Sequence, residues 1–179
     1  TMHVAPYAQC PVVVVHSGLE GGLPFEDTAG YPGNPGQVVL GYDGSPASNR
    51  AAAFAFRHAA AIGTGVVAVS VEPGRGQPET EEIDPENATP GSDTSAFHSP
   101  VIVTASAFPD VPVSFVAGTG RPAEVMLSEA VGAELLVVGS RGSGGFAGLI
   151  MGSVSQKLLA YASCPVAVLH PGIPAETAA

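Results

Sequence analysis

The amino-acid sequence predicts an α/β domain with a parallel sheet and helices on both faces of that sheet. Short apolar runs alternate with segments of helical periodicity along the chain, and such alternation builds right-handed βαβ units. Two of the runs, residues 38–40 and 66–71, are apolar at nearly every position, which is typical of strands buried on both faces. The chain has 179 residues, enough to bury a core without a disulfide or a metal.

The first half of this domain has clear boundary residues. The first strand covers residues 38–40 and ends in a Gly-Tyr-Asp-Gly turn. Ser45 and Pro46 predict the start of a helix, because serine is a favoured N-cap and proline is favoured at the first helical position. Apolar residues at helical spacing extend this helix to Ile62. Residues 66–71 form the second strand.

The middle of the chain is acidic and less regular. Residues 72–98 carry seven carboxylates against one arginine, which predicts a solvated loop. A short helix is expected from Ser99 onward. Residues 111–116 form the third strand, and Pro112 predicts an edge position because proline cannot donate to a sheet ladder.

The last third returns to strict alternation. A helix is predicted at residues 122–131 and a strand at residues 134–140, whose residues 135–139 form a continuous apolar run. A glycine-rich loop follows at residues 141–152, then a helix at residues 152–162 and the last strand at residues 164–170. Ligands of such sheets bind beyond the carboxyl ends of the strands, where the strand order reverses.

Charge and cysteine content exclude several functions. The formal net charge is −10 and the six Lys and Arg residues are scattered, so there is no basic patch for nucleic acid or for an anionic membrane. Cys10 and Cys164 are too few for a disulfide framework and lack the spacing of a zinc site. No apolar run approaches a membrane span, and a cytoplasmic location is expected.

The glycine-rich loop has the composition of an anion site. Residues 135–175 contain no Asp or Glu, although the chain has sixteen of them, and Arg141 lies within this stretch. Its glycines leave backbone N–H groups uncovered, and Ser153 and Ser155 offer hydroxyl groups at a helix start, where the helix dipole attracts anions. The loop therefore predicts a phosphate-binding site.

Three common phosphate-loop patterns do not fit. A Walker A loop needs a lysine after its last glycine, and the "GSVS" stretch has none. Gly142, Gly144 and Ala147 imitate a dinucleotide fingerprint, but the acidic residue expected about 20 positions later is absent. An ATP-splitting "SGGxDS" loop belongs after the first strand, and the "SGG" here follows the fourth.

One pattern does match. Gly139 and Gly142 are separated by two residues, and Gly152 and Ser153 follow after nine intervening residues. Together with "VVLGYDGS", "GRPAE" and "CPVAVL", this spacing resembles the ATP loop of the universal stress protein family over residues 37–171. The resemblance implies a Rossmann-like fold whose five parallel strands have the order 3-2-1-4-5.

The resemblance also implies a site for ATP accompanied by Mg²⁺. The triphosphate would contact Gly139, Arg141, Gly142, Gly145, Gly152, Ser153, Val154 and Ser155. Gly41, Tyr42, Asp43 and Ser45 would lie on the nucleoside side, with Asp43 as the metal ligand, and the backbone near Val67 and Val69 would meet the adenine. Asp43 has a second interpretation as the brace of an Asp-Gly turn, and Arg141 has one as a solvated loop residue.

A repeated segment suggests the chain's organisation. "YAQCPV" near the start and "YASCPV" near the end are almost the same strand signal. Because that signal closes a domain of this family, residues 1–16 are expected to be the terminal strand of a preceding domain, residues 17–36 a linker and residues 172–179 a tail. The four valines from Val12 to Val15 are expected to pair with the edge from Pro165 to Leu169, in this chain, in a companion domain or in a homodimer.

Three functions follow from this interpretation. The first is a stress-response module that binds ATP and acts through conformation or partner binding. The second is a weak ATPase or self-phosphorylating protein with Ser153 or Ser155 as acceptor. The third is a scaffold that has lost nucleotide binding. No catalytic base can be placed beside the glycine loop, which predicts slow hydrolysis at most.

Overall fold

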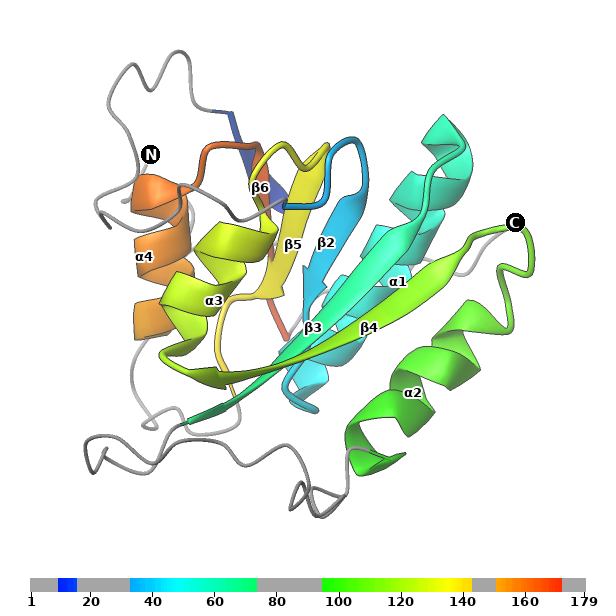
Figure 1. Ribbon diagram of the computed structural model, residues 1–179, viewed down its shortest axis with the longest axis horizontal. Helices are drawn as coiled ribbons and strands as arrows, with labels where there is room; N and C mark the ends of the chain where they lie inside the picture. The colour runs from blue at the N-terminus through cyan, green and yellow to red at the C-terminus, as the bar shows by residue number, and fades with distance from the viewer. Residues whose placement is uncertain (1–9, 16–32, 74–94, 143–150, 172–179) are drawn as a thin grey trace, which may run out of the picture.

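The computed structural model describes residues 10–15, 33–73, 95–142 and 151–171. A single sheet lies between two layers of helices (Figure 1). Its strands are β1 (Val12–Val14), β2 (Val38–Gly41), β3 (Val66–Pro73), β4 (Val113–Gly120), β5 (Leu135–Gly139) and β6 (Val166–Leu169). The helices are α1 (Pro46–Ile62), α2 (Ser95–Ala105), α3 (Pro122–Glu129) and α4 (Ser153–Tyr161).

The strand order is β1-β6-β5-β2-β3-β4. Strands β2 to β6 pair in parallel, so the predicted α/β fold and the 3-2-1-4-5 order of five parallel strands are confirmed. The edge position predicted for the third strand, β4, is confirmed as well. The sheet has one strand more than the five expected, because β1 adds to the edge of β6 in the antiparallel direction.

The pairing of β1 with β6 forms within this chain. Val12 lies opposite Val168, Val13 opposite Ala167 and Val14 opposite Val166. The expected pairing with the last strand is thus confirmed for Val12 to Val14, while Val15 lies outside the ladder. The pairing covers an edge that would otherwise expose unpaired backbone groups.

Local signals fix helix α1 as predicted. Ser45 is the N-cap, with an extended backbone, and its side chain accepts a hydrogen bond from Ser48 N. Gly63 ends the helix in the left-handed region at φ 71°, where a side chain would be strained. Helix α4 likewise begins one residue after Gly152, its N-cap.

Other boundaries differ from the prediction because tertiary contacts set them. Strand β3 extends to Pro73 and pairs with Gly120 of β4 at that end, so the acidic segment begins after the strand. Helix α2 begins at Ser95, before Pro100, instead of at Ser99. Residues 95–98, assigned above to the acidic loop, therefore belong to this helix.

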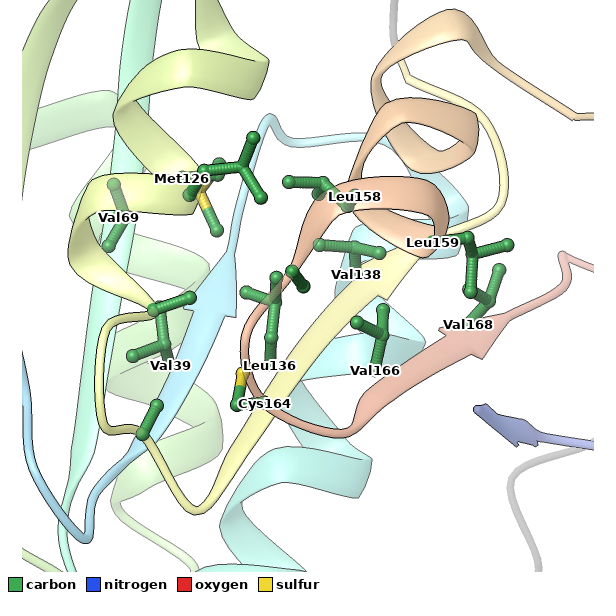
Figure 2. Packing of buried hydrophobic residues seen from close by; sticks show 14 of the residues in the cluster. Val39, Val69, Met126, Leu136, Val138, Leu158, Leu159, Cys164, Val166 and Val168 are labelled. Atoms are coloured by element: carbon green, nitrogen blue, oxygen red, sulfur yellow. The ribbon is translucent and has the colours of Figure 1, made fainter. Parts of the chain in front are cut away.

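The two faces of the sheet bury separate cores. Helices α3 and α4 cover one face, where Val39, Leu136 and Val166 meet Met126 and Leu158 (Figure 2). Helices α1 and α2 cover the other face, where Leu40 and Val137 of the sheet share a core with Phe56 of α1 and Val101 of α2. The continuous apolar strands of the sequence are explained by this burial on both sides.

Part of the expected linker packs on the domain. Asn34 Nδ2 donates to the Glu129 carbonyl at 2.9 Å and to its Oε2 at 2.8 Å, and Gly36 N donates to Gly132 O at 3.0 Å. The chain is therefore anchored on the end of α3 before β2 begins. Residues 16–32 and 172–179 lie outside the described residues.

Candidate functional site

The candidate site lies at the carboxyl ends of β2 and β5. These strands are neighbours at the centre of the sheet, and the chain leaves them in opposite directions, β2 toward β3 and β5 toward β6. This is the point of strand-order reversal where ligands of such sheets bind. Helices α1 and α4 begin beside it, so two helix N-termini face the same end of the sheet (Figure 1).

The turn after β2 is built around Asp43. Its Oδ1 accepts a hydrogen bond from Ser45 N at 3.1 Å, the two-residue side-chain turn that favours Asp in such loops. Tyr42 is buried, and its hydroxyl donates to Asn49 Oδ1 at 2.7 Å. Burial, and secondly the charge of Asp43, raise the pKa of Tyr42 above its usual value, which favours the protonated phenol that donates to Asn49.

The turn after β5 is held closely against the start of α1. A Cβ placed on Gly139 would lie 2.8 Å from Ala47 Cβ and 3.0 Å from the Ala47 carbonyl carbon, so glycine is needed for helix packing there. Ser140 is fully buried and its amide donates to Leu169 O at 2.8 Å. Its hydroxyl oxygen is buried with no hydrogen-bond partner in the described part of the chain.

The two turns contact each other. Ser45 Oγ donates to Arg141 O at 3.3 Å. A Cβ on Gly142 would lie 2.6 Å from Asp43 Oδ2, which means that the Asp43 carboxylate lies directly against the Gly142 backbone. The structure therefore brings together residues that are about a hundred positions apart, and that the resemblance assigned to one site.

Helix α4 presents its first turn to the same place. Gly152 is its N-cap and supplies no side-chain capping bond, while Gly152 N donates to Ser140 O at 2.7 Å. The amides of Ser153, Val154 and Ser155 are first-turn groups that have no acceptor within an α-helix. Such groups, with the helix dipole, attract anions.

The two serines of this turn differ sharply. Ser153 is exposed. Ser155 is 4% exposed, and its hydroxyl donates to Gly139 O at 2.8 Å and to Ser140 O at 3.3 Å. Of these two serines, therefore, only Ser153 is accessible to a ligand outside the protein.

Of the remaining expected contacts, Gly41 and Val69 border the turn after β2, Val67 lies deeper in β3, and Gly145 is not among the described residues. Val67 and Val69 have side chains in the core, while Val69 pairs with Gly41 and its carbonyl accepts from Tyr42 N at 2.9 Å. Gly41 lies in β2, where a Cβ would come 3.0 Å from Met126 Cε.

Two further findings bear on the kind of site. Among the described residues, no group of three or more His, Cys, Asp or Glu side chains gathers to hold a metal ion. No helix in that part of the chain combines the length and apolar character that crossing a membrane requires.

Sequence reasoning missed Ser140 and the packing role of Gly139. For Ser140, the only signal in the sequence was its position directly after a fully apolar strand. Nothing in the sequence identified Ala47 as the neighbour of Gly139, because that contact depends on how closely α1 approaches β5.

Known proteins show the same sequence pattern and fold. Residues 36–170 match the sequence model of the universal stress protein family. Universal stress protein Rv2005c of Mycobacterium tuberculosis is 35% identical over 170 residues, covering 90% of this chain and 52% of the relative. The universal stress protein encoded in the QAH/OAS sulfhydrylase 3′ region of Thermus aquaticus is 37% identical over 140 residues, covering 74% of this chain and 97% of the relative.

One similar protein of known structure has a bound nucleotide. A universal stress protein crystallised in complex with cAMP has a TM-score of 0.58 and 25% identity, and the match covers 76% of this chain and 98% of that one. This chain spans about half the length of the mycobacterial relatives that it matches. From the family match and the near-complete coverage of the Thermus protein, the chain belongs to the universal stress protein family.

Proposed function

We propose that this domain binds ATP at the carboxyl ends of β2 and β5 and acts through nucleotide-dependent conformation or partner binding. The observation that carries the proposal is the meeting of the Arg141–Gly142 turn, the first turn of α4 and the Asp43 turn at one point of the sheet. Because residues 135–171 contain no acidic side chain, amide donors and Arg141 dominate the electrostatics on the α4 side. The cAMP complex of a structural relative supports an adenine nucleotide as the ligand.

The described residues suggest how the phosphates of ATP and an accompanying Mg²⁺ would be held. Phosphate oxygens would accept hydrogen bonds from the first-turn amides of α4, from the exposed Ser153 hydroxyl and from Arg141. Mg²⁺ is commonly bound through one or two carboxylates together with the phosphates of a substrate. Asp43 supplies one carboxylate beside Gly142, so a metal held jointly by Asp43 and the phosphates fits this site.

The geometry favours binding over phosphoryl transfer. Among the described residues, Asp43 is the one carboxylate at the two turns, and its Oδ1 already accepts from Ser45 N. The buried Ser155 hydroxyl is committed to backbone carbonyls, so it is a poor phosphoryl acceptor. Ser153 is the acceptor that the second candidate function, slow self-phosphorylation, requires.

Isothermal titration of the nucleotide-free protein with Mg-ATP tests the proposal. Wild-type protein should bind ATP more tightly than adenosine. Arg141→Ala should weaken ATP binding about tenfold, since one hydrogen bond to a charged group contributes about 1.5–3 kcal/mol. Lys157→Ala removes the same charge from an exposed position on α4 and serves as the control, with little effect expected.

Two results would contradict the proposal. Absence of ATP binding at millimolar concentration would show that the site is not a nucleotide site. Steady release of labelled phosphate from γ-labelled ATP, abolished by Asp43→Ala, would show an ATPase instead of a binding module.

The edge strand supports a companion domain as partner. Val13 and Ala167 occupy equivalent positions in the repeated Cys-Pro-Val segments, 154 residues apart, and they lie directly opposite each other in the β1–β6 ladder. The two segments are thus related by local two-fold symmetry, as in an isologous interface. We propose that β1 occupies the place of the last strand of a second family domain.

A further inference from the structure

Three successive carbonyl groups at the end of β5 are tied to other parts of the protein. Gly139 O accepts from the Ser155 hydroxyl at 2.8 Å, and Ser140 O accepts from the same hydroxyl at 3.3 Å and from Gly152 N at 2.7 Å. Arg141 O accepts from the Ser45 hydroxyl at 3.3 Å. The start of α4 and the N-cap of α1 therefore hold this turn from two sides.

These bonds determine where the amides of Arg141 and Gly142 point, whereas the Ser140 amide already donates to Leu169 O at 2.8 Å. In a trans peptide unit the C=O and N–H bonds lie in one plane and point in opposite directions. With Ser140 O directed at Ser155 and Gly152, the N–H of Arg141 must point away from α4. With Arg141 O directed at Ser45, the N–H of Gly142 must point away from the N-cap of α1.

We propose that Ser155 is a positioning residue of the nucleotide site, whose buried hydroxyl ties the Gly139 and Ser140 carbonyls to α4 and so fixes the Arg141–Gly142 turn relative to the first-turn amides of α4 that would bind phosphate. The inference rests on the proposed function and refines it. Ser155 is not a phosphate ligand through its hydroxyl, because a hydroxyl group has one proton to donate and this proton is shared between two carbonyls. A phosphate oxygen needs a donor, and Ser155 has no second one on its side chain.

Because Ser155 is buried, loss of its hydroxyl should have a local effect on the turn after β5. Ser155 is 4% exposed, so solvent does not replace a lost hydroxyl donor easily. Removing the hydroxyl leaves Gly139 O without the donor described here, while Gly152 N still holds Ser140 O. The end of β5 would then lose its hydrogen bonds to the body of α4 and keep only the bond to Gly152 N, so the Arg141–Gly142 turn could shift relative to the first turn of α4.

The test compares ATP with adenosine, because only ATP has phosphates for the turn to bind. We expect Ser155→Ala to weaken ATP binding at least tenfold by titration calorimetry, and to change adenosine binding less than twofold. Ser155→Thr and Ser155→Val form a pair of nearly equal volume in which only Thr keeps the hydroxyl. Thr should restore ATP affinity to within threefold of wild type, and Val should not.

A control separates positioning from loss of stability. Ser128 Oγ donates to the Glu124 carbonyl at 3.0 Å in α3, so Ser128→Ala removes a similar hydroxyl–carbonyl bond away from the turn and should leave ATP affinity unchanged. Should Ser155→Ala not fold, the Thr and Val variants decide the question alone.

Each alternative outcome has a definite meaning. ATP affinity within twofold of wild type in Ser155→Ala, equal affinity of the Thr and Val variants, or parallel losses for ATP and adenosine would each overturn the positioning role. A wild-type protein that binds neither compound would instead overturn the proposed function, and the positioning role with it.

Discussion

At the scale of single residues, the glycines of the phosphate-loop motif have three different functions. Gly139 lets α1 approach β5, since a Cβ would meet Ala47. Gly142 leaves room for the Asp43 carboxylate, and Gly152 is the N-cap of α4. A motif that resembles a ligand-binding signature thus also encodes packing between a helix and a strand.

Gly139→Ala should destabilise the protein by about 1–3 kcal/mol, because the new methyl group forces α1 away from the sheet. Its nearest neighbours would be Ala47 Cβ and backbone atoms of residues 47 and 48, none of which can rotate away. In Gly152→Ala the nearest heavy atom would be Ser140 O at 3.5 Å, an ordinary contact. Urea unfolding of both variants measures the difference, and equal midpoints for the two would contradict this account.

The buried hydroxyl of Ser140 gives a second prediction. A buried hydroxyl without a partner loses its hydration without compensation, and Ser140 Oγ has none among the described residues. Ser140→Ala should therefore raise the free energy of unfolding of the nucleotide-free protein by up to about 1 kcal/mol.

Ser48 provides the matched control. It is also buried, but its hydroxyl donates to Ser45 O at 3.0 Å, so Ser48→Ala should lower the free energy of unfolding by about 1 kcal/mol. Thermal unfolding of the two variants side by side tests the contrast, and a larger loss for Ser140→Ala than for Ser48→Ala would show that Ser140 has a partner after all.

The sequence predicted which residues meet at the site better than it predicted what their side chains do. Asp43, Ser45 and Arg141 follow strands that parallel pairing places side by side, so their meeting could be expected from topology alone. The hydrogen-bond acceptors of the Ser155 hydroxyl could not be expected from topology, because they depend on the path of the turn after β5.

At the scale of elements, local signals succeeded where they were strong. Helix α1 has an N-cap serine, an N-terminal proline and a glycine stop, and its boundaries match the prediction. The ends of β3 and the start of α2 lack such signals. They are set by pairing with β4 and by burial of Val101 against α1 and the sheet, which no local pattern reports.

Strand β1 should prevent self-association through β6. All four residues of β6 are buried, and β1 pairs with its open edge, so deletion of residues 1–15 would expose unpaired backbone groups beside an apolar strand. We expect the shortened protein to form dimers or larger species at concentrations where the intact chain does not. Sedimentation velocity measures this directly.

The control for this deletion is a substitution on the same segment. Val15 is 71% exposed and lies outside the paired residues of β1, so Val15→Ser should leave the sedimentation of the intact chain unchanged. If the deletion variant stays monomeric and its β6 amides exchange slowly, β6 does not need to pair with β1 to remain stable and unassociated.

At the scale of the whole molecule, one sheet separates two cores, and Cys164 reports on one of them. It lies just before β6 and belongs to the core under α3 and α4 (Figure 2). Burial raises the pKa of the Cys164 thiol from its ordinary value of 9.0 to about 11. Cys10, the equivalent residue of the repeated segment, is exposed, so the two thiols of the chain sense different surroundings.

The raised pKa makes global stability depend on alkaline pH. Below pH 9 the thiol is protonated in both the folded and the unfolded states and has no effect. Above pH 9 the unfolded chain loses its proton first, so the unfolded state binds fewer protons and the free energy of unfolding falls as pH rises toward 11. Two pKa units correspond to a loss of about 2–3 kcal/mol.

Because Tyr42 also has a raised pKa, wild-type protein should be compared with Cys164→Ala, which keeps the contribution of Tyr42. The variant should be less stable at pH 8 through lost packing, and its deficit should shrink by about 2–3 kcal/mol between pH 8 and pH 11. Urea unfolding at several pH values measures this deficit, and a constant one would mean that water reaches the thiol and that the core under α4 is open to solvent.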